Sequence, residues 1–428
     1  MTGTTVERAP TEPKLPPQVR GALLALIVGG VAAILDSTMV TLALHTLAVK
    51  LHSSDGNIQW VTTGYLLALA VAIPITGWAE SRWGGKRVWM FALLLFVFGS
   101  ILCALSWSDG SLIGFRILQG FGGGLILPLM QTLAVRAAGG HASSRLMATV
   151  SLPIALGPIL GPVIGGVILN WLSWRWLFLV NVPVIAVGLT LAWRLLPDDR
   201  GRAGSRSDAT RPRLDLIGLA LLAPALAGIL LGLSNLSRDG SIDHAGVLGW
   251  LLVGIALLAG FVVWVLHRRD RQPIVDIRLL GLRSLGSASA VLFTAGATLY
   301  AALFLLPLYY QQLRGETVLH AGLIMIPQGI GALAARLIVG KLVDRFGVHA
   351  VTIASFLLAA AATVPFAFAG PHTSQWWLGA MLLIRGLGIG AVLIPSMSVA
   401  DQGWAIGITV AAVLPALVLP TSRRPEQN

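Results

Sequence analysis

One carboxylate stands well inside an apolar stretch, and its chemistry is the first clue in the sequence. Asp36 lies within residues 21–47, where most neighbours are apolar. An ionised carboxylate in hydrocarbon is costly, so the side chain must face a cavity, pair with a cation or take up a proton. Two interpretations follow. Asp36 either carries a proton by alternating between a paired and a protonated form, or it is one half of a structural ion pair.

A matching cation stands in another apolar stretch, 111–135. Arg116 keeps its charge at any physiological pH, and Gln119 follows one helical turn later. Arg116 either modulates proton exchange at a nearby acid or ties its helix to neighbouring carbonyl groups, and Gln119 is expected in the same polar network. We therefore predict a proton-coupling site made of Asp36, Arg116 and Gln119.

A second arginine occupies a similar setting near the end of the chain. Arg385 lies within the apolar stretch 376–398, directly before Gly386 and ten residues before Pro395. No acid in that part of the sequence is an obvious partner. Arg385 is thus either a functional counterpart of Arg116 or a packing residue.

Glycine and proline recur at helical spacing in the stretch 146–169. Gly157, Gly161 and Gly165 fall every four residues, which leaves one helix face without side chains and lets a neighbouring helix approach closely. Pro158 and Pro162 stiffen or kink the same stretch, and Gly166 follows it. The face serves either generic helix packing or a more specific gate.

Other kinds of chemistry find no support. The single cysteine, Cys103, excludes a disulfide framework and a cysteine-based zinc site, and the eight histidines show no metal-binding spacing. The run from Gly386 formally fits a nucleotide-binding fingerprint, but no strand precedes it. No nucleophile stands beside a base in a catalytic arrangement. We predict no enzyme activity, no metal and no cofactor.

Composition shows what must position these residues. Of the 428 residues, 56% are hydrophobic and only 11% are charged, whereas soluble domains carry about 25% charged residues. A bilayer-spanning helix needs roughly 20 apolar residues, and the alternation typical of barrel strands is absent. We therefore expect an all-α polytopic membrane protein with about thirteen transmembrane helices, at 21–47, 58–79, 88–106, 111–135, 146–169, 175–196, 214–235, 247–266, 284–312, 318–340, 348–369, 376–398 and 403–420.

Basic residues gather in alternate loops, and this indicates the orientation. The loops on the side of the N-terminus hold most of the lysines and arginines, and the opposite loops hold Lys50, Arg238 and Arg314. Cytoplasmic loops carry such an excess, so we predict a cytoplasmic N-terminus and a multi-pass plasma-membrane protein. The net charge of +12 then faces anionic lipid heads rather than nucleic acid. The excess of arginine over lysine points to a bacterial source.

Two motifs repeat at nearly one offset. Gly-x4-Arg-x-Gly occurs from Gly77 and again from Gly340, 263 residues apart, and Arg116 and Arg385 are 269 residues apart. A duplicated unit follows, in which helices nine to twelve echo helices one to four. The predicted organisation is a tail 1–20, a six-helix bundle 21–196, a linker 197–213, two extra helices 214–266, a linker 267–283, an incomplete bundle 284–420 and a tail 421–428.

These motifs together resemble the major facilitator superfamily, and within it the 14-helix drug:proton antiporters of the EmrB/QacA type. The similarity extends over nearly the whole chain and rests on segments 35–44, 77–87, 112–120, 157–166, 174–183, 306–309 and 340–347. The resemblance implies two pseudo-symmetric helical bundles with two extra central helices. It assigns the glycines and prolines of 157–166 to an antiporter motif. It also assigns two cytoplasmic gate loops, made of Gly77, Arg82, Gly84, Arg87, Gly340, Asp344, Arg345 and Gly347; topogenic charge is the simpler explanation of their basic residues.

The sequence departs from that family in a few places. His45 stands where the family usually has proline, and Ser81 where the loop motif usually has aspartate. Between Pro395 and Asn428 there are too few residues for two helices. We therefore expect the counterpart of the fifth helix to be missing from the repeat.

The resemblance implies a transporter that exports small amphiphilic compounds across the plasma membrane in exchange for protons, acting as a monomer in the lipid bilayer. A facilitator or symporter on the same fold is one alternative, because fold alone does not separate them. A remnant that no longer transports and serves as a membrane partner is the other. With Asp36 as the one clear intramembrane acid, neutral, monocationic or anionic compounds are the expected cargo.

Overall fold

The computed structural model describes residues 16–138, 144–197, 214–239, 245–267, 273, 275–370 and 372–400. Every regular element in this part of the chain is helical. The elements are α1 Pro17–Lys50, α2 Asp55–Ile58, α3 Trp60–Trp83, α4 Gly85–Ala104, α5 Asp109–Ala137, α6 Ser144–Trp171, α7 Trp176–Leu179, α8 Asn181–Leu195, α10 Leu216–Asp239, α11 Ala245–His267, η2 Ile277–Gly281, α12 Arg283–Leu308, η3 Tyr309–Leu313, α13 Val318–Ile324, α14 Ile326–Ala367 and α15 Gln375–Ala400.

The helices match the predicted membrane spans. By length and composition, eleven segments of the described chain could cross a membrane, and α6 adds a helix of 28 residues. The prediction of an all-α polytopic fold is confirmed. The thirteenth predicted span, 403–420, and the tail 421–428 lie outside the described residues. So do residues 1–15 of the first tail, residues 198–213 of the first linker and a smaller part of the second linker.

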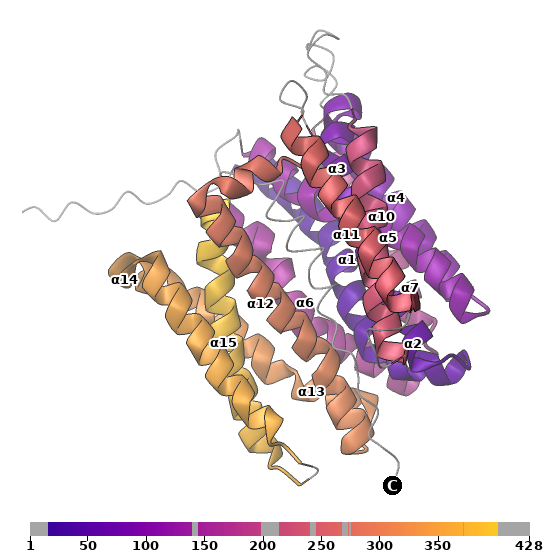
Figure 1. The fold of residues 1–428 in the computed structure, drawn as a ribbon. Coiled ribbons are helices and arrows are strands. Elements are labelled where there is room, and N and C mark those ends of the chain that lie inside the picture. The colour runs from indigo at the N-terminus through magenta and orange to yellow at the C-terminus, as the bar shows by residue number, and fades with distance from the viewer. Residues whose placement is uncertain are drawn as a thin grey trace, which may run out of the picture.

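Figure 1 shows two groups of helices: an N-terminal half, α1–α8, and a C-terminal half, α12–α15. Within the N-terminal half, α3 packs on α5, α4 on α5, and α1 on α6 and α8. In the C-terminal half α14 and α15 run along each other, and α12 packs on α15. The extra helices α10 and α11 pack together and against α3, where Leu222 and Phe261 form a cluster with Ala70. A hydrogen bond also joins α3 to α10, in which Trp60 Nε1 donates to Ser234 Oγ at 3.1 Å.

The repeat appears in the backbone at one position of each half. Gly84 stands between α3 and α4 with φ 86° and ψ 149°, and Gly347 breaks α14 with φ 80° and ψ 159°. Only glycine adopts such a conformation without strain. The two are 263 residues apart, as are Gly77 and Gly340.

The residues of the predicted gate loops lie mostly on helices that meet at a tight junction. Arg82 lies on α3 and Arg87 on α4, with only Gly84 between the helices, and Arg345 likewise lies on α14. Because one positive-φ glycine already separates the two helices, no longer loop forms. The bundle end at Gly84 is called the Gly84 end below, and the opposite end, where α1 stops, the Lys50 end.

Candidate functional site

Asp36 and Arg116 form a salt bridge at the centre of the N-terminal half. Arg116 Nη1 donates to Asp36 Oδ2, and both side chains are wholly buried. Asp36 comes from α1 and Arg116 from α5, so the pair joins two helices. Removing either partner would leave an uncompensated buried charge, which is strongly destabilising.

Two amides hold the other oxygen of the carboxylate. Gln119 Nε2 donates to Asp36 Oδ1 at 3.0 Å, and Asn181 Nδ2 donates to the same atom at 2.7 Å. With Arg116, three N–H groups from α5 and α8 therefore face the carboxylate. Hydrogen bonds that involve a charged group are stronger than those between neutral groups, so the carboxylate joins α1 firmly to both helices.

A serine completes the network around the amides. Ser100 Oγ on α4 accepts from Gln119 Nε2 at 2.7 Å and from Asn181 Nδ2 at 3.3 Å. Its own hydroxyl donates to the Phe96 carbonyl at 2.9 Å. Arg116 Nη1 also donates to Gln119 Oε1 at 2.7 Å. The cluster thus joins α1, α4, α5 and α8, and all of its side chains are buried.

Helix α3 supports the guanidinium from a further side. Arg116 Nε donates to the Val61 carbonyl at 3.1 Å, and the guanidinium carbon lies 4.0 Å from the centre of the Tyr65 ring. A cation over an aromatic face is stabilised by the ring quadrupole. Arg116 Nη2 is buried and has no hydrogen-bond acceptor among the described residues. The arginine is held without a full set of acceptors.

Glycines bring these helices close enough for the network to form. A Cβ on Gly99 of α4 would lie 2.7 Å from Gln119 Cα, and a Cβ on Gly120 of α5 would meet the Tyr65 carbonyl. The absence of side chains lets α4 and α3 approach α5 closely.

The sequence prediction named three of these residues and missed the rest. Asp36, Arg116 and Gln119 do lie together, but Asn181, Ser100 and Tyr65 were not predicted as site residues. Asn181 gave a usable signal, since an amide inside the apolar stretch 175–196 needs a polar partner. Ser100 gave none, because a serine can bond to its own helix.

The predicted antiporter motif on α6 faces α1. A Cβ on Gly161 would collide with the Thr38 side chain, and Gly157 and Gly165 face α1 in the same way. The Thr38 hydroxyl donates to the Gly157 carbonyl at 3.2 Å. Thr38 is two residues from Asp36 in α1 but lies on a different face of that helix. The Pro158 side chain is not among those the structure describes.

A different face of α6 meets the C-terminal half. A Cβ on Gly166 would lie 2.9 Å from Leu319 Cα, and a Cβ on Gly322 would meet the Pro162 carbonyl. Leu319 and Gly322 belong to α13. The predicted motif therefore contacts α1 on one face of α6 and the C-terminal half of the molecule on another face.

The predicted gate residues at the Gly84 end are exposed. Arg82, Arg87 and Arg345 are open to the surroundings, and the Asp344 side chain is not described. Cβ atoms on Gly77 and Gly340 would meet no described atom within 4 Å. Their role as gate residues stays a prediction.

Other side chains make the described contacts at this end. Arg136 Nη1 lies 3.0 Å from Glu80 Oε1, linking α5 to α3. Lys86 Nζ donates to the carbonyls of Trp193 and Leu196 at 2.9 and 2.7 Å, linking α4 to the end of α8. These contacts stay within the N-terminal half.

Arg385 is buried in the C-terminal half among neutral oxygens. Gly386 packs on the Gln328 backbone of α14, as Gly120 packs on Tyr65. Three hydrogen bonds hold the guanidinium, to Thr363 Oγ1 at 3.1 Å, Gln328 Oε1 at 2.7 Å and the Thr298 carbonyl at 2.6 Å. The Pro395 side chain is not described.

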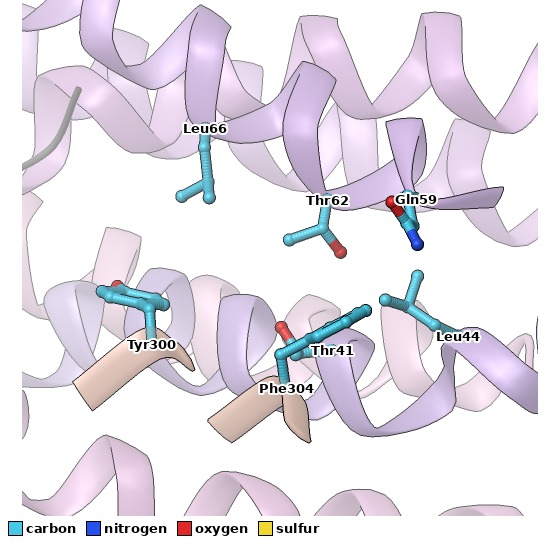
Figure 2. Close-up of a pocket in the computed structure, with 7 residues that line it drawn as sticks. All are labelled: Thr41, Leu44, Gln59, Thr62, Leu66, Tyr300 and Phe304. Atoms are coloured by element: carbon cyan, nitrogen blue, oxygen red, sulfur yellow. The ribbon is translucent and has the colours of Figure 1, made fainter. Parts of the chain in front are cut away.

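The two halves also meet at a small pocket toward the Lys50 end. Figure 2 shows Thr62 and Leu66 of α3 facing Tyr300 and Phe304 of α12 across the space. Residues of α1 and the start of α3 complete the wall: Thr41, Leu44 and Gln59. A further contact between the halves lies nearby, where Leu42 clusters with Tyr310 and Ala321.

Among the described residues, no group of three or more His, Cys, Asp or Glu side chains could hold a metal ion. The buried cluster is instead an acid, a base and neutral amides. One side chain of each charge, Asp36 and Arg116, stands at its centre.

Comparison with known proteins gives consistent matches. The family model described as Major Facilitator Superfamily matches residues 26–414. The chain is 36% identical over 378 residues to a multidrug resistance protein B homolog of Mycobacterium tuberculosis (strain ATCC 25618 / H37Rv), which covers 88% of this chain and 68% of that protein. It is 31% identical over 373 residues to a putative multidrug resistance protein MdtD of Pectobacterium atrosepticum, covering 87% and 77%.

Two solved structures share the fold at low sequence identity. A POT family transporter in complex with a thioalcohol-conjugated peptide superimposes with a TM-score of 0.63 at 17% identity, over 93% of this chain and 88% of that one. The nucleoside transporter NupG superimposes with a TM-score of 0.59 at 15% identity, over 93% and 89%. These matches concern the arrangement of the helices alone.

Proposed function

The chain belongs to the major facilitator superfamily, and from that premise we propose that it exports small amphiphilic compounds across the bacterial plasma membrane in exchange for protons. Family membership makes it a secondary transporter rather than an enzyme. Its relatives are named multidrug resistance proteins, which supports drug-like cargo. The proton-antiport step is our own addition and depends on the buried cluster around Asp36.

One observation carries the proposal: a wholly buried carboxylate pairs with a buried arginine and accepts from two amides. Buried ion pairs are poor sources of stability, because desolvation offsets the attraction between the charges. Intramembrane acids with a named partner are functional candidates for the same reason. Protonation of Asp36 would release Arg116, and loss of the proton would restore the pair. The cluster can therefore alternate between two states with one proton.

The contacts between the halves suggest the order of events. We take the Lys50 end as the outer face and the N-terminus as cytoplasmic. The halves touch at the outer face through α6 and α13, and Asp36 is paired with Arg116. This arrangement fits a stage at which the proton has left toward the cytoplasm and the cargo site awaits loading. Opening of the outer face would then exchange cargo for a proton.

The division of the chain follows the same proposal. Residues 21–196 and 284–420 form the two bundles that rock against each other. Residues 214–266 add two helices beside α3, and the basic segments 197–213 and 267–283 face the cytoplasm. We expect a monomer to suffice, with protons and cargo as its ligands.

Flux measurements with a single probe test the proposal. Purified protein is reconstituted in proteoliposomes, a pH gradient is imposed, and ethidium movement is followed by fluorescence. Antiport predicts ethidium accumulation against its gradient, driven by protons moving the opposite way. Asp36→Asn should reduce this gradient-driven flux at least 100-fold, while Asp36→Glu, which keeps an acid, should retain part of it.

The alternatives give different results in the same experiment. Downhill ethidium flux that ignores the pH gradient would indicate a facilitator, and proton and ethidium movement in the same direction would indicate a symporter. No flux by well-folded protein would indicate a partner protein that does not transport. Normal gradient-driven flux in Asp36→Asn would remove Asp36 from the mechanism.

A further inference from the structure

The pocket between α1, α3 and α12 contains a polar atom without a partner. Thr62 is buried, and its hydroxyl oxygen has no hydrogen-bond partner among the described residues. In Figure 2 this hydroxyl points into the space between α3 and α1. The Thr41 hydroxyl on the facing wall already donates to the Ser37 carbonyl at 2.8 Å. A buried hydroxyl left unpaired costs free energy, so such groups usually have a ligand or water to bind.

We propose that this pocket binds the uncharged hydrogen-bonding group of the transported compound, and that Thr62 is the residue that recognises it. The inference rests on the proposed transport function for its physiological role. The pocket takes one wall from each half of the molecule, Thr62 from α3 and Phe304 from α12. A ligand group held here would therefore touch both parts that move during transport.

The wall chemistry defines the ligand class. No lining side chain is charged; the seven comprise two leucines, two aromatic rings, two threonines and a glutamine. Such a wall accommodates an aromatic or aliphatic body with a carbonyl, ether or hydroxyl oxygen, and offers nothing to compensate a cation. In the present arrangement the space suffices for about one water-sized group. The pocket would thus hold one end of a ligand while the rest extends along the interface.

Helix α3 connects this pocket to the Asp36 cluster. Val61 and Tyr65 face Arg116, through the Val61 carbonyl and the Tyr65 ring. Thr62 and Leu66, the next residue in each case, line the pocket. The members of each pair are four residues apart, so each pair lies on one face of α3, and the two faces are adjacent. A small rotation or shift of this one turn, when a ligand binds Thr62, would change the support of Arg116 and so the proton affinity of Asp36.

Equilibrium binding tests the recognition step independently of transport. The full chain in lipid nanodiscs is titrated with radiolabelled 2-acetylnaphthalene, which carries a carbonyl acceptor, and with 2-isopropylnaphthalene, which has a similar shape without it. Empty nanodiscs give the lipid background. Thr62→Val, which removes only the hydroxyl, should raise the Kd of the ketone about 3- to 10-fold, the range expected for one hydrogen bond. The Kd of the hydrocarbon should stay within about twofold.

Two matched variants control for the substitution itself. Thr76→Val removes a buried hydroxyl from the same helix, but that hydroxyl already donates to the Ala72 carbonyl at 3.2 Å, so the Kd of the ketone should not change. Thr62→Ser retains the hydroxyl and should bind the ketone like the parent. An equal weakening of both ligands by Thr62→Val, or no weakening of the ketone, would overturn the assignment.

The connection through α3 has its own readout. If ligand and proton are coupled, each must alter the affinity for the other. The Kd of the ketone should therefore change with pH in the parent and not in Asp36→Asn. Among the described residues, the titratable and charged groups that interact with Asp36 from the packed helices are Arg116, Tyr65 and Cys103, and Arg116 keeps its charge throughout. A pH-independent Kd in the parent would overturn the coupling.

These outcomes separate the inference from the proposed function. Binding that depends on Thr62, without any gradient-driven ethidium flux, would support the pocket and refute the proposed transport. Proton-driven flux without ketone binding would refute the pocket and leave the transport proposal standing.

Discussion

Each half of the molecule buries one arginine at the same position of the repeat, and the two arginines have different partners. In the N-terminal half Arg116 faces an ionisable acid, Asp36, contributed by α1. In the C-terminal half α12 takes the place of α1, and the group it offers to Arg385 is the Thr298 main-chain carbonyl. The other described acceptors of Arg385 are neutral oxygens as well.

The difference shows how one fold separates two tasks. A neutral acceptor can satisfy a buried guanidinium but cannot take up a proton, so Arg385 has a fixed environment at all ordinary pH values. Asp36 can change its charge, so the environment of Arg116 can switch. We infer that the N-terminal half performs the proton step and that the C-terminal half moves relative to it without exchanging protons.

The largest expected effect comes from removing each arginine in turn. Arg116→Gln leaves Asp36 buried without a counter-charge, which should cost about 3–5 kcal/mol and abolish gradient-driven flux. Arg385→Gln removes a charge that has no counter-charge among the described residues. The neutral oxygens that accept hydrogen bonds from Arg385 would then lack a donor. It should cost at most about 2 kcal/mol and reduce flux less than tenfold. Thermal unfolding in detergent and ethidium flux measure both effects.

The comparison fails if the two variants behave alike. Equal loss of flux would assign Arg385 a direct part in the proton step. To separate folding from function, each variant is first scored for monodisperse elution, and flux is normalised to the folded protein.

Asn181 provides the next largest effect, because it has no equivalent around Arg385. Its amide donates to the ionised carboxylate at 2.7 Å. Asn181→Ala removes that donor, so the ionised form of Asp36 loses support and protonation becomes easier. The pH of half-maximal flux should move upward by about one unit, as expected for one hydrogen bond to a charged group. Thr363→Ala, which removes a neutral partner of Arg385, should leave the pH profile in place.

The sequence predicted the scaffold better than the site. The lengths of the apolar stretches predicted the twelve spans that lie in described helices, because the thickness of the bilayer sets how long a spanning helix must be. Asp36 and Arg116 could be assigned to one site from the sequence, because a charged side chain in hydrocarbon is costly unless an opposite charge compensates it. Ser100 and Thr62 could not be assigned in the same way. Their importance depends on which helix face meets which neighbour, and near-uniform apolarity leaves little periodicity from which to read the facing side.

Glycines test the part of the comparison in which the halves are the same. Gly84 and Gly347 share a positive φ near 80°. Alanine at either site should cost about 1–3 kcal/mol, because the backbone must be held in a conformation that L-residues avoid. Gly77→Ala and Gly340→Ala, where a Cβ meets no described atom within 4 Å, should be neutral or stabilise by up to about 1 kcal/mol. Unequal costs at Gly84 and Gly347, measured by thermal unfolding, would mean that the two turns no longer serve the same role.

The smallest effect is expected from adding the acid that the C-terminal half lacks. Gln328 Oε1 accepts from Arg385 Nη1 at 2.7 Å and is buried. Gln328→Glu keeps the shape and turns that bond into an ion pair. The unfolding free energy should change by less than about 1 kcal/mol, because desolvation of the new carboxylate offsets its attraction to Arg385. The number of protons exchanged per ethidium should not change, because the new carboxylate lacks the paired amides that surround Asp36 and lies in the half that we take not to exchange protons. A change in that number would show that an acid beside a buried arginine is sufficient for proton exchange. The distinction between the halves would then reduce to one side chain.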